Sequence, residues 1–95
     1  MADETPQAQI DFSTFVLSLG SSALVHLGEI EHPESGQGRE NLQLARQTID
    51  ILAMLQERTR GNLTTEESRF LADLLADLRL RFVERSRVRV DGDAG

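Results

Sequence analysis

The chain contains no cysteine, tryptophan, tyrosine or lysine. Without cysteine, disulfides, zinc–thiolate sites and thiol nucleophiles are all excluded. Without tryptophan and tyrosine, stacking on nucleic-acid bases falls to the four phenylalanines alone. The chain starts with MADETPQAQ, which is acidic and lacks the basic segment that opens a secretory signal. These absences favour a reducing, cytoplasmic setting.

Positive charge is also scarce, because the formal net charge of the 95 residues is −6. This balance argues against nucleic acid or an anionic membrane as the partner. The charge is uneven: residues 1–40 carry seven acidic side chains and one arginine, Arg39. Residues 79–95 carry five arginines against three acidic residues. The length fits a single domain whose burial is limited, so a second chain would help to stabilise it.

Residues 12–28 contain no charged side chain, although 27% of the whole chain is charged. Asp11 suits the N-cap position just before this segment. Gly28 suits the position where a helix stops in a left-handed turn. We therefore predict a helix over 12–28 that is apolar or small on nearly every side. A small protein rarely makes such a helix unless several partners cover it.

At 100° per residue, this first helix has two faces. The larger apolar face holds Phe12, Phe15, Val16, Leu19, Ala23 and Leu27, and Leu17 and Leu24 extend it. The opposite face holds short uncharged side chains: Thr14, Ser18, Ser21, Ser22 and Val25. A face meant for water would normally carry Glu, Lys or Gln, whereas small side chains let another backbone approach. We expect the first face to meet the core and the second to mediate self-association.

The same segment is too short to span a membrane. At 1.5 Å per residue it covers about 25 Å, against about 30 Å for the hydrocarbon core. Its serines and His26 lower its hydropathy, and it lacks the basic flanks that favour peripheral insertion. We therefore expect no membrane span.

Two further helices follow a loop over residues 29–40, which contains one proline and two glycines. Asn41 can cap a helix over about 41–60. Thr64 and Glu67 form a capping box that opens a third helix over about 65–85. Beyond Glu84 the alternating RSRVRV indicates a short strand or no regular structure. We expect a disordered acidic head over 1–10, a helical domain over 11–85 and a flexible tail over 86–95.

Three blocks of the chain resemble a known family. They read FSTFVLSLGSSALVHLGEI, then NLQLARQTIDILAMLQERTRGNLTTEE, then FLADLLADLRLRFVE, and together cover roughly residues 12–84. In this order they resemble the bacterial family catalogued as domain of unknown function 1844. The resemblance implies a short, cytosolic, helical bacterial protein with no assigned activity, and it supplies no catalytic residues.

His26 is the first candidate for a ligand site. Together with Glu29, Glu31 and His32 it forms a loose set of metal-ligand residue types. The two histidines lie six positions apart across a helix end, which fits no strong ligand spacing. A core or interface histidine explains His26 better, with a ligand site or a pH switch as the sharper alternative. We assign no metal and no cofactor.

No residues have the spacing of a catalytic site. Ser18, Ser21 and Ser22 of the first helix lie outside a nucleophile elbow, and their helix contains no acid. Asp73 and Asp77 lie one turn apart, which would suit an acid–base pair. Because Arg69 and Arg81 flank them at i,i+4 spacing, a solvated salt-bridge face explains them better. We expect no enzymatic activity.

Five arginines cluster near the end of the chain: Arg79, Arg81, Arg85, Arg87 and Arg89. Cations near a helix C-terminus stabilise the helix by about 0.3–1 kcal/mol each at low salt, which supports a structural role for these arginines. The alternative is a contact with an anion, an acidic partner or nucleic acid. The acidic head of a second subunit would also suit this cluster.

The sequence predicts an all-α domain in which a hairpin of the second and third helices packs on a central first helix. A dimer, or a dimer of dimers, would complete the fold. The favoured function is a non-enzymatic, self-associating interaction module with an unidentified protein partner. One alternative is a regulatory binder of nucleic acid or an acidic partner through the arginine cluster. The other is a metal or small-molecule site at His26 and the 29–40 loop.

Overall fold

The protein folds as three helices: α1 (Phe12–His26), α2 (Leu42–Arg58) and α3 (Thr65–Ala94). The computed structural model describes residues 10–30 and 40–94, and their side chains up to Val88. These residues include no strand, so the all-α prediction is confirmed for them. Residues 1–9 of the head predicted over 1–10, and residues 31–39 of the predicted loop over 29–40, lie outside the described residues.

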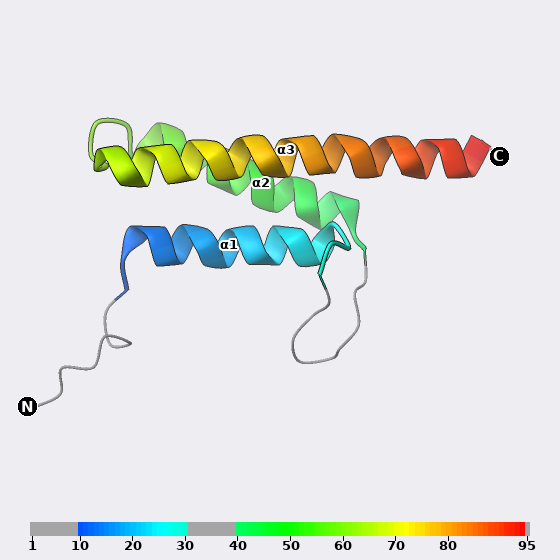
Figure 1. The fold of residues 1–95 in the computed structure, drawn as a ribbon, viewed down its shortest axis with the longest axis horizontal. Helices are drawn as coiled ribbons and strands as arrows, with labels where there is room; N and C mark the ends of the chain where they lie inside the picture. The colour runs from blue at the N-terminus through cyan, green and yellow to red at the C-terminus, as the bar shows by residue number, and fades with distance from the viewer. Residues whose placement is uncertain (1–9, 31–39, 95) are drawn as a thin grey trace, which may run out of the picture.

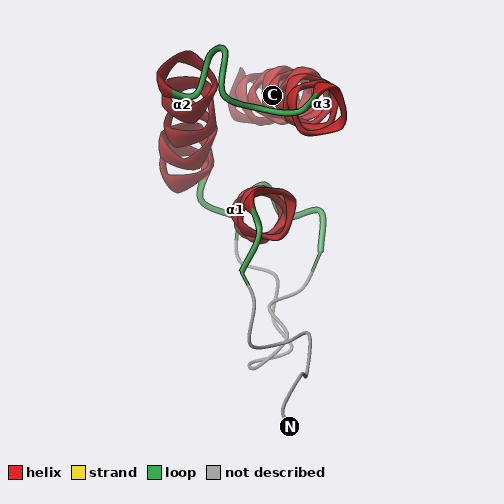
Figure 2. Ribbon diagram, turned by 90° about the vertical axis from the view of Figure 1, so that its left-hand side faces the viewer, coloured by secondary structure: helices red, strands yellow, loops and turns green. Residues whose placement is uncertain are grey.

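The three helices run up, down and up. α1 and α3 point in the same direction, and α2 returns at an incline behind them (Figure 1). Seen from the side, the helices occupy the corners of a triangle (Figure 2), and each contacts the other two. Each helix therefore turns one stripe toward a shared core and leaves its remaining surface outside.

The helix starts lie where the sequence predicts them. The Asp11 carboxylate accepts a hydrogen bond from the backbone N–H of Thr14 at 2.8 Å, and Asn41 caps α2 in the same way. Thr64 and Glu67 exchange two hydrogen bonds of 2.9 and 3.0 Å, which confirms the capping box. The backbone hydrogen bond lowers the pKa of Asp11. The charged cap therefore stabilises α1 at neutral pH, and this contribution is lost as acid titrates the carboxyl group through its lowered pKa.

The core is a single cluster of nine buried apolar side chains: two from α1, one from its C-cap residue Leu27, and three each from α2 and α3. Its members are Val16, Ala23, Leu27, Ala45, Ile49, Leu52, Leu71, Leu75 and Leu78. Leucines of α3 recur at intervals of three and four residues, which keeps them on one stripe. Leu52, Leu71 and Leu78 have no exposed surface at all.

The buried stripe of α1 is rotated from the predicted one. It follows Val16, Gly20, Ala23 and Leu27, whereas Phe15 and Leu17 are 44% and 53% exposed. The prediction that these two side chains share the core face is therefore wrong. Gly20 lies on this buried stripe, where a Cβ atom would stand 2.9 Å from Cδ2 of Leu74. The leucine of α3 occupies the space that a side chain at position 20 would need.

α3 is longer than the sequence suggests, because it continues past Glu84 and Arg85 to Ala94. The sequence left residues 85–90 as a short strand or irregular chain, and both alternatives are wrong because the predicted tail is helical up to Ala94. Residues 65–91 contain no glycine or proline that would interrupt the helix, and arginine is a good helix former. The short alternation of Arg and Val is compatible with the helix, whose upstream turns are already fixed by the core.

We predict opposite outcomes for two neighbouring leucines of α3. Leu78 is fully buried, and Leu80 is 58% exposed. Leu78→Ala should lower the free energy of unfolding by about 2–5 kcal/mol, because it leaves a cavity. Leu80→Ala should change it by no more than about 0.5 kcal/mol. Urea unfolding followed by circular dichroism measures both, and equal losses would contradict the rotation of α3 described here.

Candidate functional site

α1 presents an uncharged surface on the side opposite its buried stripe. We call this surface the outer face, and it consists of Thr14, Phe15, Leu17, Ser18, Ser21, Ser22 and Val25. All of these are exposed except Val25, which is half-buried. In Figure 2, α2 and α3 both lie on one side of α1, so that its other side is left open by the described helices. The structure thus exposes four of the five residues that the sequence assigns to self-association, and leaves Val25 half-buried.

The outer face differs from the exposed sides of the other helices. On α2, exposed Met54 has Asp50 and Arg58 one turn away on either side. On α3, exposed Leu80 is followed one turn later by Glu84. Charged neighbours of this kind keep an exposed apolar side chain hydrated. The outer face of α1 contains no such group.

One hydroxyl of the outer face is already satisfied within the helix. Ser18 Oγ donates a hydrogen bond to the backbone carbonyl of Phe15 at 2.8 Å. A buried hydroxyl without a partner is costly, whereas a bonded one loses little when water is removed. Ser18 can therefore be covered by another surface without leaving its donor unpaired.

The end of α1 fixes the position of Glu29. Gly28 has a φ of +79°, a left-handed conformation that favours glycine. The N–H groups of Gly28 and Glu29 each donate at 2.9 Å, to the carbonyls of Val25 and Leu24 respectively. This pair of bonds is a Schellman motif, and it confirms the predicted stop at Gly28. It turns the chain so that Glu29 lies beside α3.

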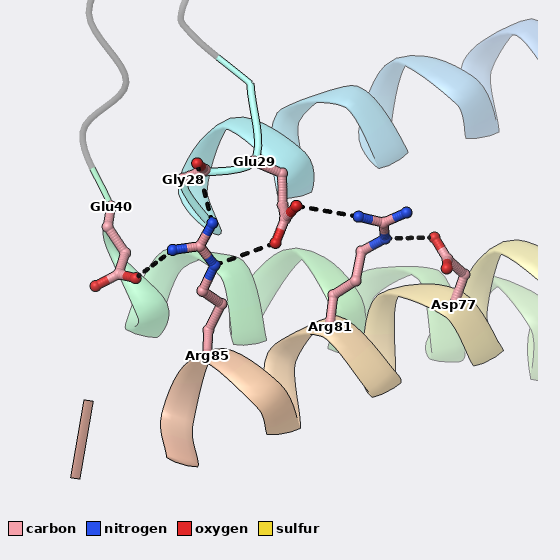
Figure 3. A network of polar contacts seen from close by, with 6 residues as sticks. All are labelled: Gly28, Glu29, Glu40, Asp77, Arg81 and Arg85. Carbon is pink, nitrogen blue, oxygen red and sulfur yellow. Dashed lines mark hydrogen bonds and ion pairs between the residues drawn. The ribbon is translucent and has the colours of Figure 1, made fainter. Parts of the chain in front are cut away.

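Glu29 lies between two arginines of α3 (Figure 3). Its two carboxylate oxygens accept hydrogen bonds from Arg81 and Arg85, each at 3.1 Å. Arg85 also lies 3.8 Å from Glu40 and donates to the carbonyl of Gly28 at 3.4 Å. We call Glu29, Glu40, Arg81 and Arg85 the arginine clasp. It ties α3 to both ends of the segment that joins α1 to α2.

Arg81 also makes a contact along its own helix. Its Nε donates to Asp77 at 2.8 Å, which confirms the predicted i,i+4 pair and raises the pKa of Arg81. Asp77 is thus engaged by an arginine, as a salt-bridge face requires. The pairing of Glu29 with α3 was missed by the sequence analysis. Two features of the sequence could have indicated this pairing: an acidic residue directly after the glycine that ends α1, and two arginines one helical turn apart.

The clasp divides the predicted arginine cluster. Arg81 and Arg85 are half-buried and paired within the chain, while Arg79 and Arg87 are exposed. The side chain of Arg89 lies outside the described part of the structure. An anion or acidic partner at Arg81 or Arg85 would have to displace Glu29. Binding through this cluster stays a prediction.

His26 lies half-buried in the last turn of α1. Its backbone carbonyl accepts a hydrogen bond from the N–H of Asn41 at 2.7 Å, which joins the end of α1 to the start of α2. Glu31 and His32, which the sequence grouped with it, lie outside the described residues. Among residues 10–30 and 40–94, no group of three His, Asp or Glu side chains could hold a metal ion.

Membrane insertion was considered for the segment that forms α1. None of the helices described in the structure combines the length and the apolar character that a bilayer crossing needs.

We predict that the clasp contributes salt-dependent stability. Glu29→Gln removes one partner of two half-exposed ion pairs, so the free energy of unfolding should fall by about 1 kcal/mol. The difference from the wild type should shrink at about 1 M salt, where exposed charges are screened within about 3 Å.

The matched control is Glu57→Gln, which removes a fully local and more exposed pair with Arg60. Its effect should be within about 0.5 kcal/mol. Urea titrations at two salt concentrations measure both variants. Indistinguishable losses for the two would show that the clasp does not hold α3 to the junction.

Comparison with known proteins identifies the family of the chain. No curated protein and no solved structure matches it. A family model described as "Domain of unknown function (DUF1844)" matches residues 9–84, which include α1, α2 and most of α3. The matched region also contains the outer face of α1, together with Glu29, Glu40 and Arg81 of the clasp. The chain therefore belongs to the DUF1844 family.

Proposed function

We propose that this protein is a non-enzymatic helical module that acts by associating with a second copy of itself through the outer face of α1. The observation that carries this proposal is the lack of charge on that face. Exposed helix surfaces normally carry charged side chains, as α2 and α3 do here. A face that stays uncharged over the whole length of a helix is suited to burial.

The outer face would let two copies meet in spite of their net charge. Two molecules of formal charge −6 repel one another as they approach. The outer face is where two copies can meet without bringing charged side chains into direct contact. Exposed Ile10 and Ile30 lie just before and just after α1 and add apolar surface at its two ends. Burial of apolar surface stabilises an association by about 25 cal/mol of free energy per Å² removed from water.

The chemistry of the outer face favours a binding role over a catalytic one. Its polar groups are alcohols, and the helix that carries them contains no carboxylate. A serine needs a neighbouring base to act as a nucleophile. The hydroxyl of Ser18 instead donates a hydrogen bond to the backbone carbonyl of Phe15. The face therefore offers shape and apolar area to a partner, with nothing to activate a substrate.

We predict that the protein is a dimer or larger at micromolar concentrations and that charge on the outer face disrupts it. Ser18→Glu and Ser21→Glu should each shift the protein toward monomer, because dimerisation would bury the new carboxylate unpaired. Size-exclusion chromatography with light scattering measures the mass. The control is Gln47→Glu at an exposed position of α2, which should leave the mass unchanged. A monomeric wild-type protein across the whole concentration range would contradict the proposal.

A further inference from the structure

We propose that the outward side of α3 is a docking surface for an acidic amphipathic helix of another protein. We call this surface the α3 strip, and it consists of Arg69, Ala72, Ala76, Arg79, Leu80, Val83 and Arg87. All seven residues are exposed. The inference is independent of the self-association proposed for α1, because it concerns a different helix and a different partner.

The α3 strip is a continuous line along its helix. At about 100° per residue, its members fall within an arc of about 100°, on the side away from the buried Leu78. Its four apolar members follow one another at intervals of four, four and three residues. Two helices that pack lengthwise mesh their side chains at such intervals. Because Leu80 and Val83 are 58% and 47% exposed, the strip has apolar area to offer to a helix laid along it.

Unpaired arginines give the strip its charge. The arginines of the clasp are engaged, whereas Arg69, Arg79 and Arg87 form no ion pair within residues 10–30 and 40–88. Asp73 and Glu84 border the strip along one edge and are outnumbered by the three arginines. These charges keep the strip hydrated in the free protein, and they favour a partner that brings carboxylates.

The same features argue against other occupants. A second copy presenting the same strip would place arginine near arginine, and like charges across an interface are costly. Arg69 and Arg79 lie about 15 Å apart along the helix, and Arg79 and Arg87 about 12 Å, so phosphates of a nucleic acid would meet few cations. The side chains between them are aliphatic and offer no ring for base stacking. An amphipathic helix with acidic flanks satisfies both the charge and the apolar area.

α3 is also longer than the helices it packs against. It has 30 residues, against 15 in α1 and 17 in α2. Its C-terminal end, drawn in orange and red, extends past both of them (Figure 1). A helix without packing is marginal in water, and Asp91 and Asp93 oppose the dipole at this end. A partner helix lying along the strip would reach this extension and stabilise it.

A designed peptide tests the strip. The probe is a labelled peptide of three heptads with Leu at a and d and Glu at e and g, and its matched form carries Lys in place of Glu. Fluorescence anisotropy should show binding of the full chain to the Glu peptide and not to the Lys peptide. Leu80→Ala and Arg79→Glu should each weaken binding by about tenfold. Arg46→Glu makes the same charge change at an exposed arginine of α2 and should leave binding unchanged.

The two kinds of variant separate the possible outcomes. Since Leu80 lies outside the core, Leu80→Ala reports on binding without loss of the fold. No binding of the Glu peptide, or unchanged binding by Leu80→Ala, would overturn the proposal. Equal losses for Arg79→Glu and Arg46→Glu would also overturn it, because they would reflect net charge alone. A single-stranded oligonucleotide that binds, and is weakened by Arg79→Glu but not by Leu80→Ala, would assign the strip to nucleic acid instead.

Discussion

The packing of one stripe of α1 against the other helices decides what its opposite side can do, and at Gly20 the side chain of Leu74 from α3 occupies the place of a side chain. Val16, Ala23 and Leu27 share this stripe and are fully buried, so the positions on the other side of the helix point outward. Any residue with a Cβ at position 20 would force the leucine to move. The exposure of the outer face therefore follows from the packing of the opposite stripe, whereas its lack of charge is a property of the sequence.

The arginine clasp acts at the far end of the same helix. Gly28 ends α1 in a left-handed turn, and this turn brings Glu29 within reach of Arg81 and Arg85. Because Arg85 also contacts Glu40, the two ends of the connecting segment are held against α3. The tight contact at Gly20 and the clasp together hold α1 against α3 at two separate levels. A rigid, oriented α1 is what an interaction surface on that helix requires.

Three helices of this size can enclose only a narrow core. Nine apolar side chains are fully or almost fully buried, and Phe15 and Leu17 remain exposed beside them. Under the proposed self-association a second copy covers these groups, and apolar burial of this kind supplies much of the stability of a small domain.

The sequence by itself determined where each helix begins and how α1 ends. Capping by Asp11, Asn41 and the Thr64–Glu67 pair, and the turn at Gly28, depend on residues close together in the chain. It also identified the small-residue positions of the outer face, because composition and helical periodicity are local properties. The sequence analysis ended α3 too early. The alternation of residues 85–90 suggested a break, but six residues with a period of two do not interrupt a helix whose preceding turns are already formed.

Only the tertiary structure decided which side of α1 faces the core and which arginines are engaged within the chain. The residues concerned are more than fifty positions apart, as in the pairs of Glu29 with Arg81 and Arg85. Nearly every side of α1 is apolar or small, so periodicity alone could not fix its rotation. That choice depends on contacts between helices, such as Leu74 against Gly20, that no local pattern records.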